Sequence, residues 1–168
     1  MTPSTSAEDP VMARITAAVS ASHAGDDGDA RAELLATWRE IGAAGDPLHR
    51  CTLAHYLADM YADPAQALMW DTRALDAADA LSDERVQRHH AGLQVAGFYP
   101  SLHLNLADNL RRLGSFEAAA EHIAAARARL DALPDDEYGA MIRRAVAEVA
   151  DEIARRSIAP RASAPGST

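Results

Sequence analysis

Apolar residues recur along most of this chain at the three- and four-residue spacing of amphipathic helices. Short breaks rich in Gly, Asp and Pro separate the apolar runs, and three Asp-Pro pairs each supply an N-cap followed by a proline suited to the first helical position. We therefore predict an all-α protein of seven or eight helices. The predicted helices begin at Asp9, about Asp29, Asp46 and Asp63, and a last one runs from Pro134 to about Arg156.

The stretch from Leu106 to Ala126 carries the most specific pattern in the chain. A large and a small apolar residue start the first helix, a glycine follows at the turn, and small residues recur along the second helix. These positions are Leu106, Ala107, Leu110, Gly114, Phe116, Ala119, Ile123 and Ala126. Their order and spacing resemble one tetratricopeptide repeat (TPR), which is a pair of antiparallel helices.

A second, degenerate copy of this pattern lies earlier in the chain. Leu53, Ala54 and Leu57 have the same offsets as the start of the clear copy, and Ala67 and Ala74 match if the turn gains one residue. The resemblance implies antiparallel hairpins stacked as a short, irregular TPR-like solenoid with a C-terminal capping helix. The capping face expected to pack inward is Met141, Ile142, Ala145, Val149 and Ile153.

The resemblance also implies a function, because TPR proteins most often bind a peptide or a protein on the concave side and need no enzymatic activity. In such a stack, the first helix of each hairpin lines that groove with residues not used for packing. The candidate groove residues are Thr52, His55, Asp59, Ser101, Asn105, Asp108, Asn109 and Arg112. Asparagine and arginine suit a peptide backbone or a carboxylate. The alternative is a solvated face on which Asp108 and Arg112 pair at i,i+4.

A second hypothesis, a small enzyme or small-molecule binder, rests on polar residues around an insertion, Ser82 to Pro100. Residues 83–113 are either one kinked helix or two, because Gly97 and Pro100 interrupt them. A break would open a pocket beside Tyr99 and His103, whereas a longer helix would only extend the packing. Residues that would share this pocket as general acid and base are His55, Asp59, His89, His90, Tyr99 and His103.

Cys51, His55 and Asp59 also recur every four residues, which places a thiol, an imidazole and a carboxylate on one helical face. This order resembles a nucleophilic site. A helix, however, offers no oxyanion donor, because its backbone amides are already bonded. A buried cysteine beside a surface His–Asp pair is the simpler interpretation.

The composition of the chain limits the classes of partner and ligand that we expect. A net charge of −9 disfavours nucleic acid and anionic lipid. The single cysteine allows no intrachain disulfide, and the chain contains no metal-ligand motif, phosphate loop or dinucleotide motif, so we expect no metal and no cofactor. We expect a cytoplasmic protein with a protein or peptide partner, or with a second copy of itself. The domain should span residues 9–157, between disordered tails at 1–8 and 158–168.

Overall fold

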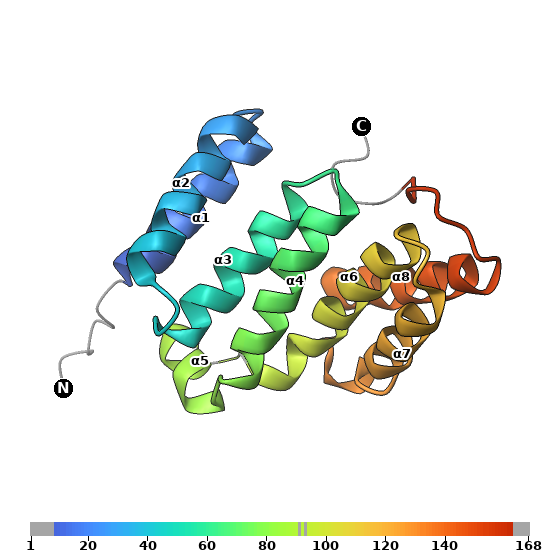
Figure 1. Cartoon of the computed structure of the whole chain (residues 1–168). Coiled ribbons are helices and arrows are strands. Elements are labelled where there is room, and N and C mark those ends of the chain that lie inside the picture. Colours follow the sequence, from blue (N-terminus) through green and yellow to red (C-terminus); the bar gives the residue numbers. More distant parts are fainter. Residues whose placement is uncertain (1–8, 91, 93, 163–168) are drawn as a thin grey trace.

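The computed structural model describes residues 9–90, 92 and 94–162, so the predicted tail at 1–8 and residues 163–168 lie outside it. The described part is entirely helical, which confirms the predicted fold class, and consecutive helices pair as antiparallel hairpins (Figure 1). No helix in it is long and apolar enough to cross a membrane. The helices are α1 (Pro10–His23), α2 (Asp27–Ile41), α3 (Pro47–Asp59), α4 (Pro64–Asp79), α5 (Asp83–His89), α6 (Tyr99–Arg112), α7 (Phe116–Arg127) and α8 (Glu137–Ala154).

Five of these helices begin at a side-chain cap, and for α1, α3 and α4 the cap is the aspartate of an Asp-Pro pair, as the sequence indicates. In each case a side-chain oxygen accepts a hydrogen bond from a backbone N–H two or three residues further on, which satisfies one of the free amides of the first turn. The capping residues are Asp9, Asp46, Asp63, Ser82 and Asp136. The sequence therefore fixes where the hairpins start.

The hairpin of α6 and α7 packs through small residues. Ala107, Ala119 and Ala126 have no exposed surface, so the two helices approach closely where these alanines lie. Gly114 has a φ of +79° in the turn between them, a conformation that costs glycine little and other residues more. The packing agrees with the small-residue pattern of the clear copy.

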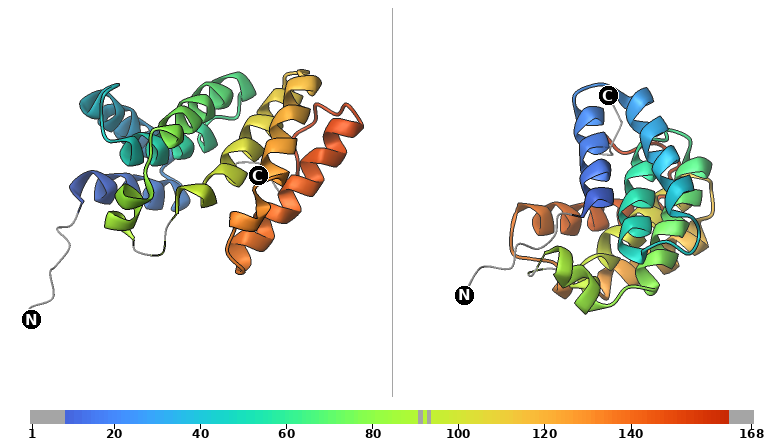
Figure 2. Two further views of the ribbon diagram at one scale, coloured as in Figure 1. Left: turned by 90° about the horizontal axis from the view of Figure 1, so that it is seen from below. Right: turned by 90° about the vertical axis from the view of Figure 1, so that its left-hand side faces the viewer.

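Helix α8 packs against both α6 and α7 at the end of the stack, as expected of a capping helix (Figure 2). Its buried face is centred on Ile142, Val146 and Val149. The prediction that Met141 faces inward was wrong, since its side chain is 49% exposed. Met141 lies about 100° around the helix from Ile142, just outside the buried stripe that Val146 continues.

The insertion contains two separate helices. Helix α5 ends at His89, a 3₁₀ turn covers Val95–Gly97, and α6 begins at Tyr99, so residues 83–113 are not one kinked helix. Arg85 holds α5 in place, because its guanidinium lies 2.6 Å from the Asp46 carboxylate and 3.3 Å from that of Asp9.

A second contact joins the same helix starts. His49 of α3 lies 2.7 Å from the Asp9 carboxylate. Asp9 and Asp46 are also the N-caps of α1 and α3. We call these four residues, Asp9, Asp46, His49 and Arg85, the N-terminal polar node. The node ties the starts of α1 and α3 to the insertion.

Candidate functional site

A pocket of about 600 Å³ lies between the middle of α3, the N-terminal end of α6 and the start of α8. Three of the predicted groove residues, Thr52, His55 and Ser101, line it. The insertion contributes Phe98 to its wall, and the turn before α8 contributes Leu133. We call this cavity the open pocket. It joins the first helices of the two hairpins to the capping helix.

The open pocket combines aromatic walls with a few hydrogen-bonding groups. Tyr56 and Tyr138 line it, and the Tyr138 side chain is 44% exposed at the rim. Burial, with a smaller contribution from nearby Asp59, raises the pKa of Tyr56, so its phenol stays neutral and able to donate. Nδ1 of His55 is buried and has no hydrogen-bond partner within the described part of the chain. An apolar surface with unsatisfied polar groups is typical of a binding pocket.

Cys51 lines the open pocket as a buried, free thiol. Its side chain is buried, and this burial raises the pKa of the thiol to about 12. A protonated thiol is a poor nucleophile. The ladder of Cys51, His55 and Asp59 therefore lacks the thiolate that a nucleophilic site needs, which favours the simpler interpretation.

Asp59, Asn105, Asp108, Asn109 and Arg112, the remaining candidate groove residues, lie towards the C-terminal ends of α3 and α6. They surround a much smaller cavity of about 50 Å³, which has room for about one water molecule. The predicted groove is thus divided into the open pocket at one end and a closely packed polar region at the other.

The centre of that polar region is Asp71 of α4, which the sequence analysis did not single out. Asp71 is 1% exposed, and its carboxylate accepts hydrogen bonds from Nδ2 of Asn109 at 2.8 Å and of Asn105 at 3.4 Å. Burial, and then the nearby Asp59, raise the pKa of Asp71 well above its usual range. Helical spacing could have indicated that Asp71 is buried, because it lies four residues after Ala67 and three before Ala74 on the buried face of α4.

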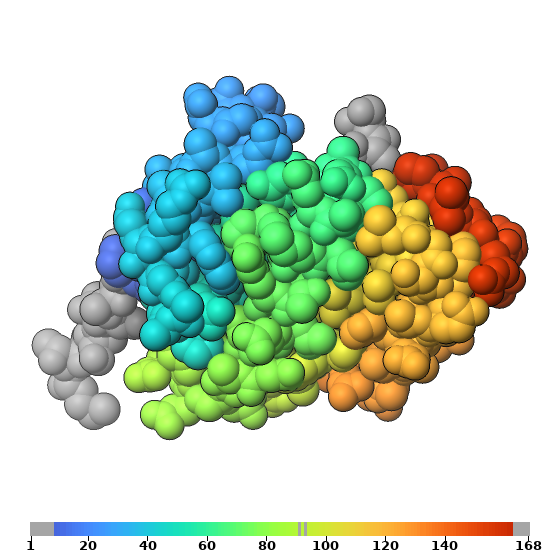
Figure 3. Space-filling view, in the orientation of Figure 1, coloured from blue at the N-terminus to red at the C-terminus, as the bar shows by residue number. Residues whose placement is uncertain are grey.

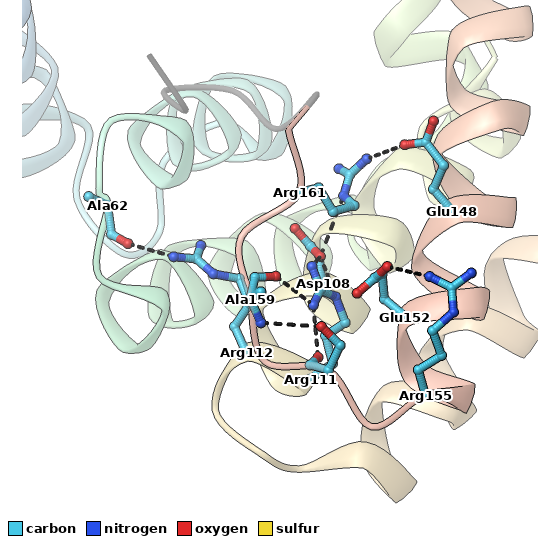
Figure 4. Close-up of polar contacts among 10 residues, drawn as sticks. Ala62, Asp108, Arg111, Arg112, Glu148, Glu152, Arg155, Ala159 and Arg161 are labelled. Atoms are coloured by element: carbon cyan, nitrogen blue, oxygen red, sulfur yellow. Dashed lines mark hydrogen bonds and ion pairs between the residues drawn. The ribbon is translucent and has the colours of Figure 1, made fainter.

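Two arginines of α6 bind backbone carbonyls. Arg112 donates to the carbonyl of Ala62 at 3.0 Å, which ties α6 to the turn between α3 and α4. The Asp108 carboxylate pairs instead with Arg111, whose Nε lies 2.8 Å away (Figure 4). The solvated pair of Asp108 and Arg112 that the i,i+4 spacing suggests is therefore replaced by an i,i+3 pair.

The residues after α8 turn back onto this polar region. Composition predicts a disordered tail from residue 158, yet the carbonyls of Ser157 and Ala159 accept hydrogen bonds from Arg111 and the Arg161 side chain reaches Asp108. In the space-filling view the red residues that follow α8 lie against the yellow surface of the α6–α7 hairpin (Figure 3). We call residues 157–162 the return segment.

Comparison of the chain with models of known protein families, with curated proteins and with solved structures gives no match. The groove is therefore interpreted from its own geometry.

The histidines expected to share one pocket lie in different places. His55 lines the open pocket, whereas His89 lines a wide cleft of about 1020 Å³ between α1, α3 and α5. His103 faces His122, with their Nδ1 atoms 2.9 Å apart, and Nδ1 of His90 accepts a hydrogen bond from the N–H of Gly92. Within the described residues, no three His, Cys, Asp or Glu side chains are placed to hold a metal ion.

Tyr99 does border a cavity, as the insertion suggested. This cavity is about 550 Å³ and is lined by Val95 and Arg129, but not by His103. The Tyr99 ring stacks on His103 at 6.1 Å, and its hydroxyl donates to Asp79 at 2.7 Å. The insertion thus contributes to the walls of three cavities, and its histidines do not gather with His55 and His103 in one acid–base centre.

Proposed function

We propose that this protein is a TPR-like interaction module that binds a segment of a partner protein or peptide in the groove between α3, α6 and α8. The observation that carries the proposal is the open pocket, whose volume of about 600 Å³ is bounded by the first helices of two consecutive hairpins and by the capping helix. A cavity of this size accommodates one or two large side chains of a bound peptide.

The chemistry of the pocket favours a peptide that presents an apolar or aromatic residue. Tyr56, Phe98 and Tyr138 supply flat apolar surface, and aromatic side chains contribute strongly to interface energies. Thr52 and His55 are placed to bond the polar groups of the peptide backbone. The alternative hypothesis, a small enzyme, receives no comparable support, because its candidate histidines lie at separate sites.

A peptide-library selection tests this proposal. Peptides selected on the wild-type chain should lose at least about tenfold in affinity for Thr52→Trp, because the indole fills the open pocket; that loss corresponds to about 1.4 kcal/mol. Thr72→Trp is the matched control, since Thr72 is exposed on α4 and does not line the pocket. Thermal unfolding of both variants checks that each remains folded.

The proposal fails if the selected peptides bind Thr52→Trp and Thr72→Trp equally well, because the pocket would then take no part in recognition. It fails equally if the selection yields no peptide that binds the wild-type chain. Chemical-shift changes at the backbone amides of residues 51–56, measured on the folded proteins, locate the bound peptide independently of its affinity.

A further inference from the structure

The return segment lies in the polar end of the groove as a bound peptide would. Its backbone is held by Arg111, whose Nη1 donates to the carbonyls of Ser157 and Ala159, each at 2.9 Å (Figure 4). The Arg111 side chain has no exposed surface, and Asp108 holds its guanidinium in place. A buried, fixed fork of this kind is preorganised to bind two carbonyls of an extended chain.

Arg161 binds the polar end of the groove through its side chain, in addition to the backbone contacts of the return segment. Its guanidinium lies between α6 and α8, 3.5 Å from the Asp108 carboxylate and 3.2 Å from that of Glu148, and its side chain is only 10% exposed. Asp59 of α3 and Asp71 of α4 line the cavity that Arg161 borders. The carboxylates that contact this guanidinium come from two helices, Asp108 from α6 and Glu148 from α8.

The two contacts differ in what they select. Arg111 binds carbonyl oxygens, which every peptide has, so it recognises an extended backbone of any sequence. The carboxylates of Asp108 and Glu148 select a cation, and they suit a guanidinium because they contact two different nitrogens of Arg161, Nε and Nη1. In the return segment, Arg161 follows the second clamped carbonyl, that of Ala159, by two positions and meets these carboxylates.

The return segment buries little apolar surface, so hydrophobic contacts contribute little to its binding in the groove. Ile158 is 61% exposed, and Ala159 and Pro160 are also on the surface. Its occupancy depends on its covalent connection to α8, which gives it an effective concentration in the millimolar range. A partner peptide with the same backbone and an arginine, and with further contacts in the open pocket, can displace it.

We propose that the polar end of the groove is a subsite for an arginine-bearing, extended peptide, and that the chain's own return segment occupies this subsite in the free protein. The inference rests on the proposed function, since the same partner would extend into the open pocket. The inference specifies the chemistry of one end of that partner, which is an arginine two residues after a clamped backbone carbonyl. It also identifies a segment of the chain itself that competes with the partner for the subsite.

The test uses the full chain with Arg161→Glu, which places a negative charge beside Asp108 and Glu148 and should expel the return segment. The probe is a synthetic peptide with the sequence of residues 155–162. Its binding is measured from the backbone amide chemical shifts of residues 105–112 of the protein. We expect Arg161→Glu to bind this peptide at least about tenfold more tightly than the wild-type chain does. Arg39→Glu is the matched control, because Arg39 is exposed on α2 and does not line the cavity that Arg161 borders.

A second peptide, with alanine in place of the arginine that corresponds to Arg161, separates arginine recognition from backbone clamping. It should bind Arg161→Glu at least about tenfold more weakly than the first peptide does. The proposal is overturned if both peptides bind alike, if the wild-type chain binds the first peptide as tightly as Arg161→Glu does, or if Arg161→Glu shows no shifts up to about 1 mM peptide.

The two proposals fail separately. Thr52→Trp introduced into Arg161→Glu should leave binding of the short peptide unchanged, because Thr52 lines the open pocket and not the arginine subsite. A failed arginine subsite therefore leaves the peptide selection on the open pocket interpretable. A failed peptide selection likewise leaves binding of the short peptide measurable.

Discussion

Ala119→Leu is the substitution that most directly probes the packing of the hairpins. Ala119 has no exposed surface and lies on α7 in the hairpin with α6, where Ala107 and Ala126 are equally buried. Leucine adds three carbon atoms at a place where the structure leaves no accessible space. Either the two helices separate or the new side chain adopts a strained rotamer, and such overpacking costs on the order of 1–3 kcal/mol.

The expected change is measurable by thermal or urea unfolding. In a domain of this size, 1 kcal/mol lowers the melting temperature by about 2–4 °C, so Ala119→Leu should melt roughly 2–12 °C below the wild-type chain. Ala120→Leu is the matched control, because it makes the same change at the next residue of α7, which is exposed. The control should stay within about 0.5 kcal/mol of the wild-type free energy of unfolding.

Equal melting temperatures for the two variants would refute the reasoning. They would mean that α6 and α7 are far enough apart at Ala119 to accept a larger residue. The close approach through small residues, on which the resemblance to a TPR hairpin depends, would then be absent.

Three further predictions concern stability and reactivity. Burial lowers the pKa of His103 and of His122, so each ring binds a proton more readily in the unfolded chain than in the folded one. The free energy of unfolding should therefore fall as the pH drops below about 6.5, and it should fall less in His122→Gln. Urea unfolding of both proteins at pH 7.5 and pH 5 measures this difference. Gly139→Ala should cost on the order of 1–3 kcal/mol in the same assay, because a Cβ would lie 1.9 Å from the Pro134 carbonyl, and an unchanged midpoint would contradict that contact. Cys51 should not react with a thiol reagent in the native protein but should react after unfolding; rapid native labelling would contradict its burial.

The sequence predicted several helix starts well because these starts carry a local signal. A capping side chain and a following proline act within one helical turn, so Asp9, Asp46 and Asp63 could be read without knowledge of the rest of the chain. The end of α5 was less predictable. Gly92 and Gly97 weaken a helix there without showing where it ends, and α5 is held by Arg85 binding to residues far away in the sequence.

The candidate site depended on such distant contacts and was predicted only in part. Thr52, His55 and Ser101 were placed in the groove by repeat spacing, and they do line the open pocket. The role of Asp71 depends on two asparagines more than thirty residues away, and that of Arg161 on α6. Composition alone suggests disorder for the return segment, because its order comes from groups outside it.

The N-terminal polar node has a consequence for how this solenoid can be divided. In a regular repeat array each unit contacts only its neighbours, so units can be removed from an end one at a time. Here Arg85 spans 76 residues to reach Asp9, and α5 has only seven residues, too few to persist as an isolated helix. Removal of the first hairpin would take away the Asp9 contact and leave Arg85 of α5 with the contact to Asp46. We therefore expect fragments that begin at α3 to hold α5, and the insertion that lines the open pocket, less firmly than the whole chain does.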